Sequence, residues 1–238
     1  MLRKWSDYKH RFLPWIYLNF TKHAVDAKAI DKPSLIDTVY TQLENFSASP
    51  QVNHRYLLKS SGFGLSIKKS SIHSRGVFVR EGRVTSGSIV GYYPGTIYTP
   101  GDSVFLQSIS NSFLFQCSDG RLVDGKNTGY SRMIYRSCGE RNRLGPYRTC
   151  DTTWLTATDS MVNPIACGQL VNNGGVNHAN VEYCEIDIDL RRVKLSQRCL
   201  IPNIQFGEPA AHMRLVVLVA VRDIVKGEEL LSAYFSLC

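Results

Sequence analysis

The chain has 238 residues, of which 43% are hydrophobic and 20% are charged. This composition is typical of a globular protein and excludes an intrinsically disordered or fibrous one. The length predicts one large domain, or one domain with an extension. No apolar run approaches the roughly 20 residues that cross a bilayer, so the sequence predicts no membrane partner.

The charge is unevenly distributed. Lys and Arg number 28 against 20 Asp and Glu, which gives a net charge of +8. The excess is concentrated in residues 1–25 and 121–148. Such basic segments suit contact with a nucleic acid, an acidic protein or an anionic cofactor, but the charge alone favours a basic protein without such a partner.

The seven cysteines are irregularly spaced, and no two form a C-x-x-C pair. This spacing indicates neither a zinc site nor a disulfide framework, so the sequence predicts no metal and free thiols in a reducing compartment. We therefore expect an intracellular protein, nuclear or cytoplasmic. The alternative is a mitochondrial protein, because the basic and aromatic residues between Arg3 and Trp15 also suit an amphipathic transit peptide.

Residues 1–56 are predicted to form a helical extension. Pro33-Ser34 is typical of a helix start, and apolar residues follow it at three- and four-residue spacing as far as Leu43. Residues 47–51, which include Pro50, are predicted to form a linker. If the first residues are not a transit peptide, we expect their aromatic side chains to pack on the rest of the chain.

From Leu57 onward the pattern predicts a β-rich α+β domain, residues 57–238. Short β-branched or aromatic segments are separated by glycine turns, at a spacing of about ten residues that disfavours repeated βαβ units. The expected strands are 64–68, 76–79, 88–92, 113–117, 122–123, 181–189 and 215–221. Asp119-Gly120 predicts a hairpin turn. Residues 126–166 are read as an insertion with a structure of its own or a functional surface.

Residues 184–190 alternate between acidic and apolar side chains. The alternation predicts a half-buried strand with Glu185, Asp187 and Asp189 on its outer face. We interpret these charges as protection against edge-to-edge pairing. The alternative is a docking strip for a basic peptide.

Four motifs carry the functional interpretation, and each has an ordinary structural alternative. Ser74-Arg75-Gly76 is a turn at which the backbone can approach a ligand, although a hairpin needs the same glycine. Tyr92-Tyr93-Pro94-Gly95 is typical of a tight turn. Asn172-Asn173-Gly174 offers two amides to a polar ligand, yet Asn-Gly is also a common hairpin turn. Tyr234, which follows Gly227-Glu228-Glu229-Leu230, is alternatively a buried tyrosine.

In this order and spacing, the motifs resemble those of the SET-domain protein lysine methyltransferases. The resemblance extends over residues 57–238 and rests on segments 74–78, 91–95, 113–125, 170–180 and 222–234. It implies a SET fold, in which several short sheets surround a threaded C-terminal segment, with the N-terminal helical extension before it.

The sequence departs from the wider family at several positions. Ser74 stands where the first glycine is usual, and Asn173 stands where the family has histidine. The chain shows no cysteine-rich zinc segment after Tyr234. We therefore expect the insertion 126–166 and the N-terminal helix to wall the cofactor and lysine channel.

The resemblance implies methyl transfer from S-adenosyl-L-methionine to a lysine of a protein substrate. The donor is a cation and the amine must be neutral, so the protein mainly positions the reactants in a desolvated channel. Tyr234 is expected to orient the amine. Tyr183 is expected to fill the space beside the small Ser232 and to limit the product to monomethyl-lysine. The implied cofactor contacts are Ser74, Arg75, Gly76, Tyr93, Asn172, Asn173 and Tyr234.

The competing interpretation is a binding module rather than an enzyme. A catalytically weak SET-like domain would hold a nucleic acid or an acidic partner through the basic segment 121–148. The presence of Asn172 and Tyr234 in their motifs favours the enzyme.

Overall fold

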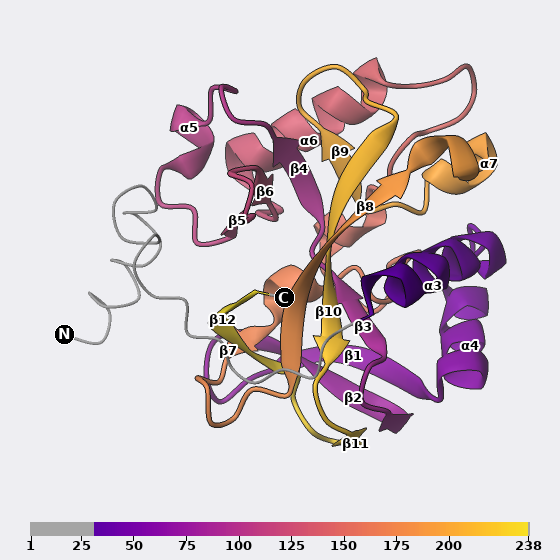
Figure 1. Ribbon diagram of the computed structural model, residues 1–238, viewed down its shortest axis with the longest axis vertical. Coiled ribbons are helices and arrows are strands. Elements are labelled where there is room, and N and C mark those ends of the chain that lie inside the picture. Colours follow the sequence, from indigo (N-terminus) through magenta and orange to yellow (C-terminus); the bar gives the residue numbers. More distant parts are fainter. Residues whose placement is uncertain (1–30, 238) are drawn as a thin grey trace.

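The computed structural model describes residues 31–237, with side chains as far as Ala233. The interpretations of the first 30 residues, as a transit peptide or as an extension that packs on the domain, concern residues outside this range. Three small sheets form the centre of the molecule, with helices along one side and around its upper end (Figure 1).

Two helices precede the first strand. Helix α3 (Lys32–Asn45) and helix α4 (Pro50–Ser61) each carry a proline in the first turn, where its missing N–H would have no intrahelical partner. Gly62, with φ of +78°, ends α4 in the left-handed conformation that glycine adopts without strain. The predicted linker 47–51 is therefore shorter than expected, because α4 begins at Pro50.

These helices share one hydrophobic core with the sheets. The Tyr40 hydroxyl accepts a hydrogen bond from the Asp189 backbone N–H at 2.8 Å. The buried Tyr92 hydroxyl donates to Gln42 Oε1 at 2.6 Å. The division predicted between residues 56 and 57 falls inside α4.

The strands form three sheets. The first has the order β1 (Phe63–Lys69), β2 (Arg75–Val84), β11 (Ile224–Val225). The second has the order β3 (Ile89–Tyr92), β10 (His212–Ala220), β8 (Val181–Asp189), β12 (Leu231–Leu237), β7 (Asn172–Asn173). The third has the order β5 (Leu114–Gln116), β6 (Leu122–Asp124), β4 (Gly95–Tyr98), β9 (Asn203–Gln205).

Strand β12 runs parallel to both of its neighbours, β7 and β8, whereas β8 and β10 form a long antiparallel pair through the centre of the molecule (Figure 1). Strands β5 and β6 form the hairpin that Asp119-Gly120 predicted, and Gly120 has φ of +85°.

Short helices connect the strands. Helix α6 (Gly129–Arg141) and the 3₁₀ helix η1 (Thr153–Thr156) lie within the predicted insertion. The others are α5 (Phe105–Ser108), η2 (Gly168–Leu170), η3 (Leu190–Arg192) and α7 (Leu195–Arg198).

The insertion 126–166 has an interior of its own. The ring of Tyr135, on α6, meets fully buried Trp154 edge to face, with centroids 5.0 Å apart. The Tyr135 hydroxyl donates to the Asp151 backbone carbonyl at 2.6 Å. These contacts hold α6 against η1.

The predicted acidic outer face of β8 was wrong at Glu185, which is buried. Arg214, on the adjacent strand β10, pairs with Glu185 and also lies 2.8 Å from Asp187 and 3.1 Å from Asp119. The Ser118 backbone N–H donates to Glu185 at 2.7 Å. Glu185 and Asp187 are paired with Arg214, so they are not a free docking strip, and β8 lies between β10 and β12, so its charges do not protect a sheet edge.

Among the helices of residues 31–237, none has both the length and the apolar character needed to cross a membrane. The six cysteines in this part of the chain are free thiols, and five of them are buried. Burial raises the pKa of Cys117, Cys150 and Cys167 to about 12, so these thiols stay protonated at neutral pH.

Candidate functional site

Strand β7 brings the paired asparagines beside the C-terminal strand. In the parallel ladder, Asn172 pairs with Leu231 and Asn173 pairs with Ser232. The Gly174 N–H continues the contact with a 2.9 Å bond to the Ser232 carbonyl. Two stretches far apart in sequence therefore lie side by side. The turn that Asn-Gly suggested comes one residue later, where Asn173 Oδ1 accepts from the Gly175 N–H at 2.8 Å.

The Asn172 side chain connects three segments. Its Nδ2 donates to Glu229 Oε1 at 2.7 Å and to the Arg75 backbone carbonyl at 3.0 Å. The other carboxylate oxygen of Glu229 accepts from Ser70 Oγ at 2.9 Å. The amide is thus fixed between the start of β2 and the turn before β12.

Gly76 permits this approach. A Cβ atom at Gly76 would lie 2.0 Å from Glu229 Oε1 and 3.0 Å from Asn172 Nδ2. Any larger residue would displace the carboxylate, so the glycine that the sequence analysis assigned to ligand contact also makes room for Glu229. Glu229 itself was missed as a functional residue, although it lies within the Gly227–Leu230 motif.

Asn180 fixes the chain as it enters β12. Its Nδ2 donates to the Glu229 carbonyl at 2.8 Å, and its Oδ1 accepts from the Leu231 N–H at 2.8 Å. The Asn180 N–H also donates to the Leu231 carbonyl at 2.8 Å. Three bonds from one residue determine where β12 begins.

A second group of predicted residues forms an aromatic cluster, which we define as Tyr93, Phe115 and Tyr183. Ring centroids lie 5.3 Å apart for Tyr93 and Phe115, 5.1 Å for Phe115 and Tyr183, and 6.1 Å for Tyr93 and Tyr183. The Tyr93 hydroxyl donates to the Phe113 carbonyl at 2.9 Å. The Tyr183 hydroxyl lies 3.4 Å from Oγ of the buried Ser232. Phe115 is a member that the sequence analysis did not assign to the site.

The remaining predicted residues lie around these two groups. Ser74 is exposed and directly precedes β2. Arg75 Nη1 donates to the Ala157 carbonyl at 3.0 Å, so the end of the insertion lies against the start of β2. Tyr234 belongs to β12, three residues after the pairing of Leu231 with Asn172, and its side chain is beyond the described ones.

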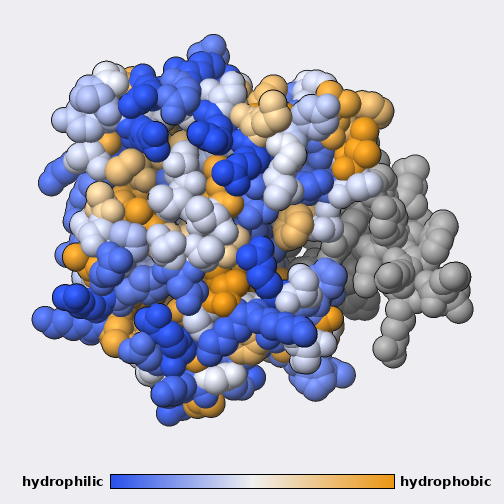
Figure 2. Space-filling view, turned by 180° about the vertical axis from the view of Figure 1, so that it is seen from behind, coloured by the Kyte–Doolittle hydropathy of each residue, from blue (hydrophilic) through white to orange (hydrophobic). Residues whose placement is uncertain are grey.

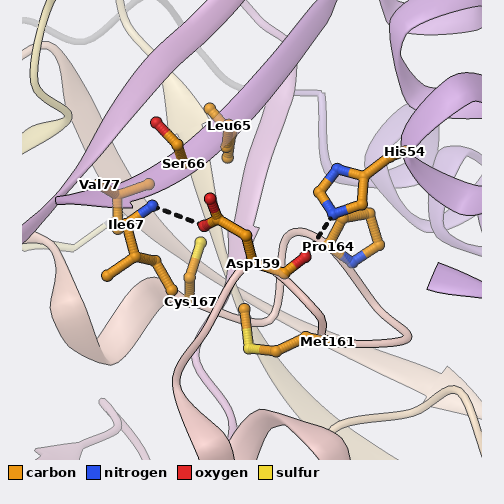
Figure 3. Close-up of a pocket in the computed structure, with 9 residues that line it drawn as sticks. All are labelled: His54, Leu65, Ser66, Ile67, Val77, Asp159, Met161, Pro164 and Cys167. Atoms are coloured by element: carbon orange, nitrogen blue, oxygen red, sulfur yellow. Dashed lines mark hydrogen bonds between the residues drawn. The ribbon is translucent and has the colours of Figure 1, made fainter. Parts of the chain in front are cut away.

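The small cavity in Figure 3 lies elsewhere, between β1 and the segment 159–167. There Asp159 accepts a 2.8 Å bond from the Ile67 N–H, and its carbonyl lies 2.9 Å from His54 Nε2. Its volume is about 10 Å³, which is room for roughly one water molecule. This cavity is too small for an organic cofactor.

The described site residues suit a cationic sulfonium ligand. In the aromatic cluster Tyr93 and Tyr183 are buried and Phe115 is partly buried, and such a dehydrated surface favours a reaction in which the sulfonium charge is lost. The exposed residues 71–75 and 175–178 flank the buried Asn172, so polar backbone groups are accessible beside it. Both hydrogens of Asn172 Nδ2 have acceptors within the chain, which leaves its Oδ1 for a ligand. An amide acceptor beside aromatic rings fits the cationic groups of S-adenosyl-L-methionine.

Comparison with known proteins decides the family. No protein-family model matches the chain. A human protein, SET domain-containing protein 9, is 34% identical over 291 residues, covering 99% of this chain and 96% of that protein. The chain belongs to the SET domain-containing protein 9 family. The protein of the same name from Pongo abelii is 45% identical over 186 residues, covering 76% of this chain and 67% of the relative.

Two solved structures are similar to the chain at lower sequence identity. CpSET8 from Cryptosporidium is 15% identical, with a TM-score of 0.39, over 98% of this chain and 94% of its own. The Neurospora SET domain protein DIM-5, a histone lysine methyltransferase, is 14% identical, with a TM-score of 0.35, over 96% of this chain and 78% of its own. Through its family, the chain is a SET-domain protein, and the prediction of this family and of a β-rich α+β SET fold is confirmed.

Proposed function

We propose that this chain is a protein-lysine methyltransferase that uses S-adenosyl-L-methionine. The observation that carries the proposal is the contact of Asn172 with both the Arg75 backbone carbonyl and Glu229, which lies two residues before β12, the strand of Tyr234. The family of SET-domain proteins, to which the chain belongs, supports the same activity.

The proposed cofactor site follows from these contacts. When bound, S-adenosyl-L-methionine supplies an electrophilic methyl group on a sulfonium cation. Asn172 and the Asn173 backbone would hold it from β7, and Ser74, Arg75 and Gly76 would hold it from the start of β2. Tyr93 would present its aromatic face on the third side. Because Glu229 fixes the Asn172 amide before the ligand arrives, little side-chain entropy is lost on binding.

The residues proposed for the lysine side act by position and by excluding water. Tyr93, Phe115 and Tyr183 form an apolar wall, which favours the neutral amine over the ammonium form. Tyr234, from its place in the motif, is assigned to orient that amine with its hydroxyl. Tyr183, beside Ser232, is assigned to limit the space for further methyl groups. The proposed substrate is a protein that places one lysine side chain against these aromatic rings.

The compartment and the walls of the channel belong to the same proposal. The buried, unreactive thiols suit a reducing intracellular compartment. Of the two segments proposed to wall the channel, the insertion reaches Arg75 through Ala157. Helix α3 contacts Asp189 at the end of β8 and Tyr92 at the end of β3, next to Tyr93.

Calorimetric titration with S-adenosyl-L-methionine tests the proposal before any substrate is known. The full chain should bind, and Asn172→Ala should bind at least about tenfold more weakly, since a buried amide contact is lost. Arg55→Gln, an exposed position on α4, is the control and should bind as the unaltered chain does. Absence of binding by the unaltered chain, together with salt-sensitive binding of nucleic acid, would instead establish the competing binding-module function.

A further inference from the structure

The basic segment 121–148 is not one continuous cationic surface. Arg121 pairs with Asp119 and Asp187, and Arg143 pairs with Glu140 at 3.0 Å. Arg141 donates to the backbone carbonyls of residues 205–207 at 2.7 to 3.2 Å. These three guanidinium groups are therefore engaged within the chain.

Three other arginines converge on one hollow. Arg132, Arg136 and Arg148 line a depression of about 200 Å³ beside α6, and the rest of its lining is Glu140, Thr152 and Leu155. Arg132 and Arg136 lie four residues apart on one face of α6. Figure 2 shows that hydrophilic residues gather at the top of the face seen from behind, the end of the molecule where α6 lies in Figure 1.

The donors in this hollow are weakly engaged. Arg132 Nη1 lies 3.5 Å from the Leu155 carbonyl, and Arg148 Nη1 lies 3.4 Å from Thr152 Oγ1; both distances are long for hydrogen bonds. Within residues 31–233, no acceptor contacts the exposed Arg136. Since Glu140 is already paired with Arg143, the hollow carries an uncompensated positive charge.

We propose that this hollow binds a phosphate monoester carried by a phosphorylated side chain of a partner protein. Arginine presents a planar fork of donors that matches phosphate oxygens, and clusters of arginines recognise phosphorylated peptides. The Thr152 hydroxyl adds a further donor. The hollow is larger than one phosphate group but smaller than the roughly 300–1,000 Å³ of typical small-molecule pockets, so a phosphate and its linking carbons fill it.

A nucleic acid fits this hollow less well. Of residues 31–233, no aromatic side chain lines it, whereas proteins that bind single strands stack bases on aromatic side chains. Among the flanking residues that the structure describes, Arg121, Arg141 and Arg143 use their N–H donors within the chain, so they do not extend the hollow into a row of free donors along a polyphosphate backbone. The observations favour one compact dianion.

The test is titration of the full chain with a phosphoserine peptide, the same peptide without phosphate, and inorganic phosphate. The phosphopeptide should bind, and inorganic phosphate should compete with it. Arg136→Gln should weaken binding about tenfold, because a charge-assisted hydrogen bond is lost, and Glu140→Gln should strengthen it. Arg55→Gln on α4 removes the same charge from an exposed helix elsewhere and should change nothing.

The pH dependence adds a second readout. Affinity should fall as the pH drops below about 6, where the phosphate loses its second charge. Equal binding of both peptides, or unchanged binding by Arg136→Gln, would overturn the proposal. So would inorganic phosphate binding without phosphopeptide binding, or tighter binding of an oligonucleotide with a salt dependence that indicates several phosphate contacts.

Discussion

Asn172 Nδ2 donates to Glu229 Oε1 at 2.7 Å, which joins two residues 57 positions apart in the sequence. The same carboxylate accepts from Ser70 Oγ at 2.9 Å. Glu229→Ala should therefore remove the acceptor of one Asn172 N–H and of the Ser70 hydroxyl, and lower the free energy of unfolding by about 1–3 kcal/mol. Urea unfolding followed by circular dichroism measures this change.

The control for that substitution is Glu81→Ala, because Glu81 forms an exposed pair with Arg80 and contacts none of the site residues. It should change the free energy of unfolding by less than about 1 kcal/mol. We also expect Glu229→Ala to weaken cofactor binding, since the Asn172 amide is no longer held. Equal stability and equal binding of the two variants would contradict this role of Glu229.

Tyr183→Phe should shift the product from monomethyl-lysine towards dimethyl-lysine. The variant removes the hydroxyl that lies 3.4 Å from Ser232 Oγ and keeps the ring in the aromatic cluster, so space for a second methyl group increases without loss of packing. Mass spectrometry of the methylated substrate reads the result. Tyr98→Phe, at a buried tyrosine outside the cluster, should leave the product unchanged, and an identical product from Tyr183→Phe would remove Tyr183 from this role.

Arg214→Met should destabilise the fold strongly. Arg214, with a side chain only 12% exposed, neutralises the buried Glu185 and two further carboxylates, and removing one member of a buried ion pair costs about 3–5 kcal/mol. Arg191→Met breaks only the exposed pair with Asp189 and should cost less than about 1 kcal/mol. Thermal and urea unfolding compare the two. Adding Glu185→Gln to Arg214→Met should recover part of the loss; equal costs for the two single variants would refute the account.

Ionisation of the buried Asp151 carboxyl should lower the free energy of unfolding as the pH rises. Burial raises the pKa of its carboxyl to about 6, above its ordinary value, so the folded state binds the proton more tightly than the unfolded state. Below about pH 4 the carboxyl is protonated in both states. Between about pH 4 and 6 the unfolded state loses the proton while the folded state keeps it, so the free energy of unfolding falls, and above about pH 6 the loss is complete.

Asp151→Asn, which cannot titrate, isolates this effect. Relative to the variant, the unaltered chain should lose up to about 3 kcal/mol of unfolding free energy between pH 4 and 7. Asp223→Asn should show the opposite trend, because a bond from the Ser86 N–H lowers the pKa of Asp223. Parallel pH profiles for the unaltered chain and Asp151→Asn would contradict the prediction.

The sequence predicted several strands well, but it predicted only residues 76–79 of β2, the longest strand, and it did not predict the seven-residue β12. Strand β8 (Val181–Asp189) was predicted with the observed bounds, and β1 and β10 nearly so, because their apolar side chains repeat over many residues. Strands β7 and β11 have two residues each. Their conformation depends on pairing with distant segments, which no local pattern records.

The site was predicted in part for the same reason. The motifs identified Asn172 and Gly76, but the partner that joins them, Glu229, lies more than 50 residues further on. The burial of Glu185 was missed because Arg214 neutralises it across the sheet. Helix α6 was missed because only one side of it is buried, at residues such as Tyr135 and Cys138, and polar residues fill the rest.

Transfer of a radiolabelled methyl group from S-adenosyl-L-methionine to a protein library, measured for the unaltered chain and for Tyr234→Phe, tests the central claim most directly. Tyr234→Phe keeps the aromatic ring and loses only the hydroxyl, so it should still bind the cofactor in a parallel titration. Its transfer should be about 100-fold slower, since the amine is no longer oriented. Equal transfer by both proteins, or cofactor binding without any transfer by the unaltered chain, would contradict the proposed enzyme.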